Sequence, residues 1–408
     1  MRRIVIVSVL AASLGAMCAQ AATNAPTPSL VEGPSPAARA TAPPAEFTKS
    51  DACEAALPKA IVGKVTLPAG CVYSRQLLVT HSHTVLNCNG AVFDGHGTLK
   101  VGLNIDSGGK PLEDVTVKNC TFQNYESHGL LIGWSGPDAS KPQNHAFLYS
   151  HTPHDITLDH ITISHSKQVG LYVDDYVQRV LIDHAVVRGS GTPGIYFEHS
   201  SREITLRDSV VSGNGGAHRE GLSIDSSAHD VVEGNTFENN TAGGVFLYRN
   251  CWEHADGPSR GSVYRWQHSN FNVIRNNIFR DEPIGVWLAS RQSKDLTRLH
   301  CGDAPMGGDR RYYRDYADNN TVEDNTFCNV KVPVRVEGDH NLILGNRFDR
   351  TNKTQVEIPV TKREQLLHLP SIGNVISGSR DYLPEMIAQD HLWSYLENRF
   401  ACCCDRGA

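Results

Sequence analysis

Carboxylate, imidazole and phenol side chains recur directly after short apolar segments of this 408-residue sequence. The groups in these positions are Asp174 with Asp175, Glu198 with His199, Asp225 with Ser226, and Tyr248 with Arg249. If the apolar segments are parallel strands of neighbouring coils, the groups lie roughly 4.8 Å apart from one coil to the next. A column of like charges is unfavourable unless it binds a cation, shares protons or faces basic groups. The spacing therefore indicates either a metal site or proton-transfer chemistry.

A metal site in this column would use Asp175, Glu198 and Asp225. Carboxylate oxygens are the ligands that calcium prefers, and a bound cation stabilises a developing enolate. If the column holds a metal, we therefore expect calcium as the cofactor, and otherwise none. The alternative is structural, because turns favour Asp and Ser for local hydrogen bonds to the backbone.

The same column offers groups that could move protons. Arg249 or His199 would remove a proton, and Tyr248 would act as the acid, with Glu198 and Asp225 beside them. Arginine is a poor base unless its environment is strongly perturbed. These groups suit β-elimination from a uronic acid, in which the C5 proton is removed and the leaving oxygen is protonated. C5 epimerisation shares the first of these steps.

Three long insertions, at about 134–154, 250–270 and 291–319, follow the segments that carry these groups. Long loops on an ordered array are commonly functional, so we expect them to wall a groove. Aromatic faces suit sugar rings, and arginine forks suit carboxylates. The candidate substrate-binding residues in the loops are Trp252, Arg265, Trp266, Arg291, Tyr312 and Arg314. Packing of these loops on the flank of the array is the alternative.

The apolar segments belong to a repeat that predicts the fold. Eight similar units end at residues 122, 163, 187, 211, 237, 279, 327 and 348. Their alternating apolar and polar residues, followed by Asn, Asp or Gly, predict coils of about 21 to 26 residues with strands in register. Aligned asparagines at positions 235, 277, 325 and 346 predict an internal ladder.

This pattern resembles the right-handed parallel β-helix superfamily, whose repeat units stand here as Asn235-Thr236-Phe237 and Gly244-Val245-Phe246-Leu247. The resemblance implies an all-β solenoid and places the chain beside pectate and alginate lyases, epimerases, polygalacturonases and tailspikes. The acidic column is similar to the calcium-binding carboxylates of pectate lyases. The segment from His151 to Asp155 is similar to the Asp-Pro-His-Asp/Glu motif of mannuronan epimerases, with Thr152 in place of the first Asp.

Together these features predict an exported enzyme acting on an acidic polysaccharide, most simply a lyase or a C5-epimerase. A polygalacturonase-like hydrolase would instead use Asp174, Asp175, Glu198 and Asp225 as acid and base. A non-catalytic polysaccharide-binding or surface protein would need only the groove and its aromatic loops. The formal net charge of −6 argues against general nucleic-acid binding.

The ends of the chain suggest export and capping. Residues 1–21 have the pattern of a signal peptide, which predicts a periplasmic or secreted protein, and residues 22–49 that of an Ala/Pro-rich linker. We expect a β-helix with its N-terminal cap over 50–352 and a helical cap over 353–408, and two caps favour a monomer. No later segment is apolar enough for a membrane span. The expected disulfides are Cys53–Cys71 and Cys251–Cys301.

Overall fold

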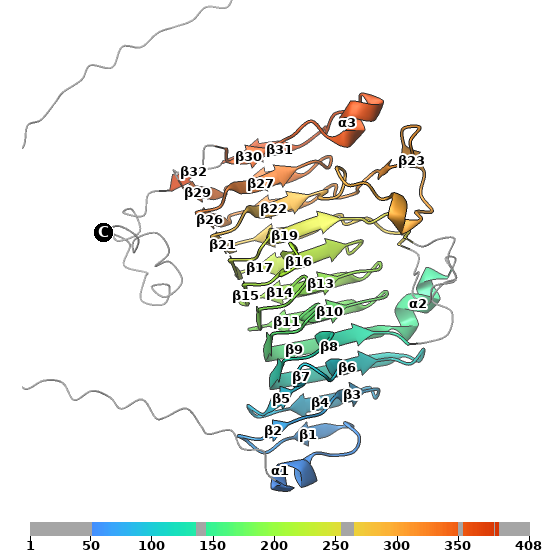
Figure 1. Cartoon of the computed structure of the whole chain (residues 1–408), viewed down its shortest axis with the longest axis vertical. Helices are drawn as coiled ribbons and strands as arrows, with labels where there is room; N and C mark the ends of the chain where they lie inside the picture. The colour runs from blue at the N-terminus through green and yellow to red at the C-terminus, as the bar shows by residue number, and fades with distance from the viewer. Residues whose placement is uncertain (1–50, 136–143, 254–264, 350–353, 379, 383–408) are drawn as a thin grey trace, which may run out of the picture. The chain divides into compact units, whose positions relative to one another are not determined.

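The computed structural model describes residues 51–135, 144–253, 265–349, 354–378 and 380–382 (Figure 1). The predicted signal peptide and linker lie outside these residues, as does the C-terminal segment from residue 383. The described chain forms short parallel strands stacked coil upon coil, with a short helix, α1 (Asp51–Ala56), at its start. The expected all-β parallel β-helix is confirmed.

One face of every coil belongs to a ten-stranded parallel sheet. Its strands, in spatial order, are β3 (Leu77–Val79), β6 (Val101–Asp106), β8 (His128–Gly133), β10 (Leu171–Val173), β13 (Ile195–Phe197), β16 (Glu220–Asp225), β19 (Gly243–Tyr248), β22 (Ile284–Leu288), β27 (Val332–Val336) and β30 (Val356–Glu357). Each strand pairs in parallel with the next coil, so equivalent positions form columns.

The other two faces join into one twenty-stranded sheet, because the long strands β7 (Leu112–Gln123) and β9 (Pro153–Ser164) run through both. The first of these faces also contains β1 (Lys64–Thr66), β4 (Thr84–Asn87), β11 (Gln178–Asp183), β14 (Arg202–Arg207), β17 (Val231–Glu233), β20 (Val273–Arg275), β25 (Thr321–Glu323), β28 (Leu342–Leu344) and β31 (Val375–Ser377). The second contains β2 (Val72–Tyr73), β5 (Val92–Asp94), β12 (Val186–Arg188), β15 (Val210–Ser212), β18 (Thr236–Glu238), β21 (Ile278–Arg280), β26 (Thr326–Cys328), β29 (Arg347–Asp349) and β32 (Arg380–Tyr382).

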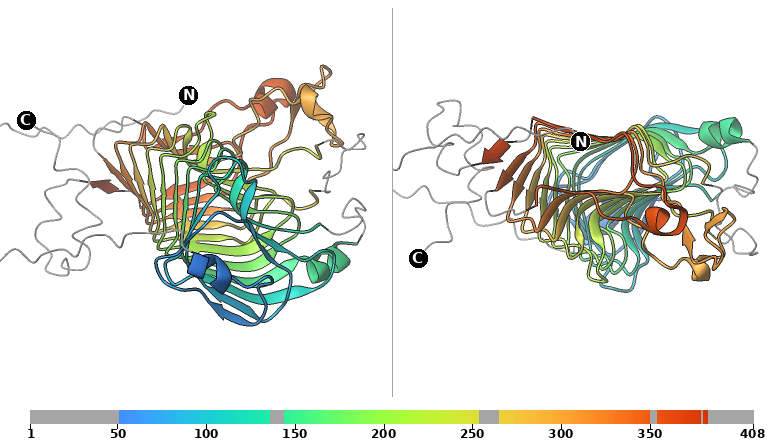
Figure 2. Two further views of the ribbon diagram at one scale, coloured as in Figure 1. Left: turned by 60° about the horizontal axis from the view of Figure 1, so that its bottom comes forward. Right: turned by 90° about the horizontal axis from the view of Figure 1, so that it is seen from above.

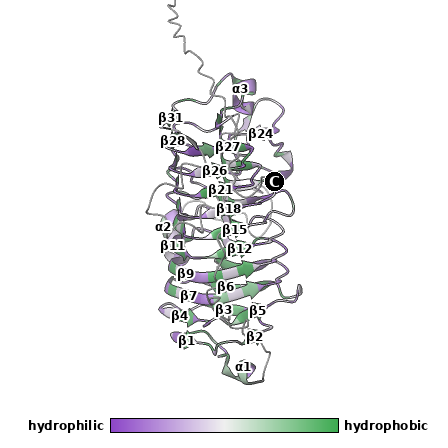
Figure 3. Ribbon diagram, turned by 90° about the vertical axis from the view of Figure 1, so that its left-hand side faces the viewer, coloured by the Kyte–Doolittle hydropathy of each residue, from purple (hydrophilic) through white to green (hydrophobic). Residues whose placement is uncertain are grey.

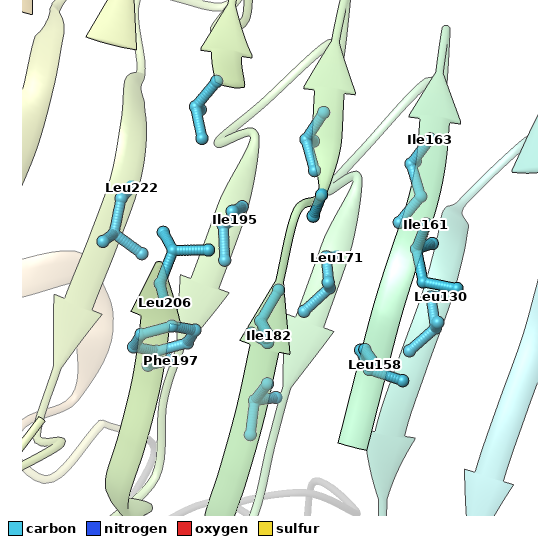
Figure 4. Packing of buried hydrophobic residues seen from close by; sticks show 14 of the residues in the cluster. Leu130, Leu158, Ile161, Ile163, Leu171, Ile182, Ile195, Phe197, Leu206 and Leu222 are labelled. Atoms are coloured by element: carbon cyan, nitrogen blue, oxygen red, sulfur yellow. The ribbon is translucent and has the colours of Figure 1, made fainter. Parts of the chain in front are cut away.

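Inward side chains of successive coils stack on one another and form one continuous core. Leu171, Ile195 and Leu222 occupy one such column, and Figure 4 shows them facing the residues of the opposite sheet. Removing this apolar surface from water is the main stabilising term of the fold. The outward positions between them are mostly polar, so hydrophobic and hydrophilic residues are mixed along the strands (Figure 3).

The predicted asparagine ladder is confirmed. The side-chain amide of Asn235 donates to the side-chain oxygen of Asn277, and the contact repeats from Asn277 to Asn325 (both 3.0 Å) and from Asn325 to Asn346 (3.1 Å). The ladder satisfies polar groups inside the turn where water is absent. Gly234 precedes the first of these asparagines and has φ of 65°, a backbone conformation in which glycine carries no steric penalty.

The described parts of the first and third insertions project from the same side of the stack, as Figures 1 and 2 show. The first contains α2 (His145–His151), and the third contains η1 (Thr297–Leu299) and the hairpin of β23 (Pro305–Met306) with β24 (Tyr312–Tyr313). Near the end of the described chain, β30 is followed by α3 (Lys362–Leu367). No described helix is both long and apolar enough to cross a membrane.

Both expected disulfides are present. Cys53 is bonded to Cys71 beside α1, and Cys251 is bonded to Cys301, which joins the second insertion to the third. A further disulfide, Cys88–Cys120, links two neighbouring coils and was not predicted. These cross-links restrain the loops and the first coils against unfolding.

Candidate functional site

We define the acidic column as Asp174, Asp175, Glu198 and Asp225. As expected, it lies at the carboxyl ends of the neighbouring strands β10, β13 and β16 of the ten-stranded sheet. The register pairs Phe197 with Ile224, so Glu198 and Asp225 follow aligned residues. The hydroxyl of Tyr196 lies between them, 3.1 Å from Glu198 Oε1 and 2.9 Å from Asp225 Oδ2. Coil stacking therefore does bring these two carboxylates together.

A buried arginine neutralises this part of the column. The guanidinium of Arg265 donates to Glu198, and its Nε lies 3.7 Å from Asp225 Oδ1. The Arg265 side chain is only 2% exposed. Asp225 also accepts hydrogen bonds from the backbone and side chain of Asn250. Both carboxylates are thus already paired inside the protein.

The remaining carboxylates of the column surround His199. Its Nδ1 lies 2.5 Å from Asp174 Oδ1 and 3.1 Å from Asp175 Oδ1, and its Nε2 lies 3.4 Å from Glu198 Oε1. Burial and Arg265 would lower the pKa of His199, but the charges of Glu198 and Asp174 raise it well above its ordinary value. Burial and the neighbouring Asp174 raise the pKa of Asp175 to about 7. His199 is therefore a cation at neutral pH rather than a free base.

These contacts bear on the calcium prediction. Each predicted ligand faces a cationic side chain: Glu198 and Asp225 face Arg265, and Asp175 faces His199. A divalent cation would have to displace these groups, and their charges would repel it. In this arrangement the residues do not fit a calcium ion. Calcium binding remains a prediction, and the proposed reaction does not use it.

Tyr248 and Arg249 point to different neighbours. The Tyr248 hydroxyl lies 2.9 Å from an Arg219 nitrogen and 3.1 Å from Glu220 Oε1, on the outer face of the ten-stranded sheet. Arg249 is buried and donates to Asp303 (2.8 Å) and to the backbone carbonyl of Arg265. These contacts indicate a structural role for Arg249 between the second and third insertions; its role as a base stays a prediction.

The predicted substrate-binding residues do not share one site. Arg265 is internal, Trp266 is 37% exposed, and Arg291 covers the ring of Tyr248 at 4.6 Å. The others pack against the insertions or against later coils: the Trp252 backbone donates to Asp303, Tyr312 lies under Lys362 of α3, and Arg314 pairs with Asp318 and with Asp339, which follows β27. The insertions are therefore partly held by their own charged and aromatic residues.

An open cavity lies between residues of the first and second insertions. We call it the histidine cavity. Its volume is about 560 Å³, within the usual range of small-molecule sites, about 300–1,000 Å³. It is lined by His145, Ala146, Tyr149, Ser150, His154, Gln178, Arg179, Arg202 and Trp266. No carboxylate side chain is among these lining residues.

The fold positions the floor of this cavity through strand register. His154, Gln178 and Arg202 occupy one aligned position near the starts of β9, β11 and β14. Helix α2 adds Tyr149, whose hydroxyl donates to the carbonyl of Ser200 (2.6 Å). The second insertion adds the ring of Trp266, stacked on His145 with centroids 4.6 Å apart.

His154 and Arg202 are held in ways that leave them functional. Nδ1 of His154 lies 2.9 Å from Asp155 Oδ2. The hydrogen bond from Arg179 holds the pKa of Asp155 down to about 2, so this partner is ionised. Such a partner fixes the ring and favours a lone pair on Nε2. Arg202 donates to the neutral amide oxygen of Gln178, at 2.7 Å, and lies over the Tyr149 ring at 3.9 Å.

Sequence reasoning singled out His154 and Asp155 through the epimerase-like motif but missed Tyr149, Gln178 and Arg202. A signal for two of them was present, because Gln178 and Arg202 stand two residues before their repeat units, as His154 does. Tyr149 had no comparable signal, since it lies in an insertion outside the repeat.

Comparison with known proteins bears on the fold. The family model of the right-handed β-helix region matches residues 96–256 and 148–301, which together span half of the chain. The chain belongs to the right-handed β-helix family. No curated protein matches the sequence.

Solved structures with the same fold include carbohydrate-active proteins. The A-module of the mannuronan C-5 epimerase AlgE4 from Azotobacter vinelandii is 15% identical, with a TM-score of 0.51 over 81% of this chain and 85% of that one. The PL6 family polysaccharide lyase Pedsa3628 from Pseudopedobacter saltans is 10% identical, with a TM-score of 0.45 over 78% and 82% of the two chains. At such identities the likeness to this β-helix shows the fold alone.

Proposed function

We propose that this β-helix protein acts on a uronate-containing polysaccharide by removing the C5 proton, as a lyase or a C5-epimerase. The observation that carries the proposal is the arrangement in the histidine cavity, where His154, Arg202 and Tyr149 line one open space. The motif-like segment around His154 and the fold shared with polysaccharide lyases and an epimerase support it.

Each of the three residues suits one part of the reaction. His154 would take the C5 proton on Nε2, because Asp155 holds Nδ1. Arg202 would pair with the uronate carboxylate and stabilise the enolate that forms. Burial raises the pKa of Tyr149, which keeps its hydroxyl protonated, so it would serve as the acid by turning its O–H from the Ser200 carbonyl to the substrate. Trp266 offers a flat face for the sugar ring.

The fate of the enolate separates the two activities. In a lyase, the proton from Tyr149 goes to the O4 leaving oxygen, the C4–O4 bond breaks and a C4–C5 double bond forms. In an epimerase, a proton returns to C5 from the opposite face and no bond of the chain is broken. Both begin with the same proton transfer to His154.

The hydrolase alternative has less support. It would use the acidic column as acid and base, but Arg265 pairs with Glu198 and Asp225, and His199 lies between Asp174 and Asp175. A hydrolytic pair needs one protonated and one free carboxyl group beside the scissile bond. A purely binding function would use the same histidine cavity without turnover.

The test is incubation of the purified protein with alginate, polygalacturonate and hyaluronan. A rise in the ultraviolet absorbance of the unsaturated product would show β-elimination. A change in uronate composition by NMR, without that absorbance, would show epimerisation. New reducing ends without unsaturation would contradict the proposal and favour a hydrolase.

A further inference from the structure

A second, smaller cavity lies on the outer face of the ten-stranded sheet. Its volume is about 160 Å³. The lining residues that matter for its chemistry are Arg219, Glu220, Phe246, Tyr248, Trp287, Arg291 and Lys294. None of these residues lines the histidine cavity. We call it the arginine cavity.

Positive charge exceeds negative charge in the arginine cavity. Its lining includes the cationic side chains of Arg219, Arg291 and Lys294 but one carboxylate, Glu220. Glu220 is paired with Arg219 at 3.1 Å. Among the described residues, Arg291 forms no ion pair, and its side chain lies over the ring of Tyr248 at 4.6 Å. The charge of Arg291 helps to lower the pKa of Glu220, but that carboxylate is already paired with Arg219, so the cavity keeps an excess of positive charge that favours binding of an anion.

Asp315, whose carboxyl group contacts the backbone of Arg291, does not neutralise the Arg291 side chain. Asp315 accepts hydrogen bonds from the backbone N–H groups of Arg249 and Arg291. Burial raises the pKa of Asp315 to about 8, so this carboxyl group is largely protonated at neutral pH. The guanidinium of Arg291 therefore keeps its charge available to a ligand.

The other walls of the cavity suit a sugar. Phe246 and Trp287 meet edge to face, with centroids 5.2 Å apart and an interplanar angle of 74°. Such rings pack against the apolar faces of sugars. Burial, with the charge of Glu220, raises the pKa of Tyr248 to about 12, so its hydroxyl is a neutral hydrogen-bonding group. The small volume suits one sugar residue rather than an oligosaccharide.

We propose that the arginine cavity is a second binding site, which takes one uronate residue of an acidic polysaccharide, with its carboxylate on Arg291 and its ring against Phe246 and Trp287. The choice of a uronate among anionic ligands rests on the proposed function. The site itself rests on its charge and its walls. Held here and in the histidine cavity, a polymer would cross the side of the stack that bears the insertions.

The test is calorimetric titration of galacturonate into a His154→Asn/Arg202→Gln variant, so that neither turnover nor binding in the histidine cavity obscures binding at the second site. We expect Arg291→Gln in that background to weaken binding at least tenfold and Arg291→Lys to weaken it less. Arg311→Gln is the matched control, because Arg311 also covers an aromatic ring, Tyr312 at 5.9 Å, but is paired with Asp295 and does not line the arginine cavity. Thermal unfolding checks that each variant is folded.

Three results would overturn the proposal: unchanged binding in Arg291→Gln, binding of glucose as tight as that of galacturonate, or equal competition by inorganic phosphate, which would indicate a general anion site. Because no turnover is measured, failure here leaves the proposed reaction untouched. Conversely, galacturonate binding that depends on Arg291 would stand even if no uronate polymer is converted.

Discussion

The acidic column and the histidine cavity are adjacent, and the consecutive residues Arg265 and Trp266 each contribute to one of them. Arg265 faces the column and pairs with Glu198, whereas Trp266 faces the cavity. In the column, every carboxylate has a cationic partner within the protein. In the cavity, Arg202 donates to a neutral amide and has only a longer, exposed contact with Glu203, at 3.6 Å, and His154 is held through one ring nitrogen. Charges that are paired internally stabilise the coils, and charges held on one side only can serve a ligand.

The largest expected effect is loss of turnover in His154→Asn. If His154 takes the proton, turnover should fall about 10²- to 10⁴-fold, the usual contribution of a general base. His160→Asn is the matched control, because His160 also holds a neighbouring aspartate through Nδ1, at 2.5 Å from Asp159, but does not line the cavity. Equal activity of the two variants would remove His154 from the mechanism.

The next effect concerns the column. Arg265→Met should lower the free energy of unfolding by about 3–5 kcal/mol, because it leaves two buried carboxylates without their partner. Urea unfolding measures this loss. Arg275→Met, which removes an exposed pair with Glu233, should cost about 1 kcal/mol or less.

The same variant sharpens the question of calcium. Calcium should raise the melting temperature of Arg265→Met, in which Glu198 and Asp225 lack their partner, and leave the wild type unchanged. A calcium-dependent rise in the wild type would instead show that the column binds the ion despite Arg265.

A smaller effect is expected for Arg202→Lys, which keeps the charge but loses the planar fork. A charged hydrogen bond contributes about 1.5–3 kcal/mol, so kcat/KM on an acidic polymer should fall about 10- to 100-fold. Kinetics on a methyl-esterified polymer provide the comparison, because that substrate has no carboxylate for Arg202 to bind. An equal loss on both substrates would contradict the role given to Arg202.

A further effect is expected in the pH dependence of stability. The pKa of Asp175 is raised to about 7 in the folded protein, from an ordinary value of 3.8. The unfolded chain therefore ionises first, and the contribution of Asp175 is lost as pH rises from about 4 to about 7. Asp175→Asn should make the fall in unfolding free energy over this range shallower. A fall as steep as that of the wild type would show that Asp175 is not responsible.

The fold could be predicted well from the sequence, because the same strand-and-turn pattern occurs in eight repeat units. The asparagines of the ladder and the alternating strands are aligned in several coils, so one error in reading would not change the result. The disulfides Cys53–Cys71 and Cys251–Cys301 followed from their positions near the ends and in the loops.

The site was harder to predict because it depends on residues outside the repeat. Tyr149 and Trp266 come from insertions, whose course the repeat does not determine. Arg265 lies in an insertion too, and nothing in its spacing showed that it would reach Glu198. The carboxylates were placed correctly at the strand ends, but their partners decide what they do.

Hydrogen exchange at C5 tests the central claim most directly, because lyase and epimerase both begin by removing this proton. Alginate and polygalacturonate would be incubated with the protein in D₂O, and the C5 proton followed by NMR. We expect the wild type to replace that proton with deuterium or to release an unsaturated product, and His154→Asn to do neither. Retention of the C5 proton in both polymers, or equal exchange by the variant, would contradict the account.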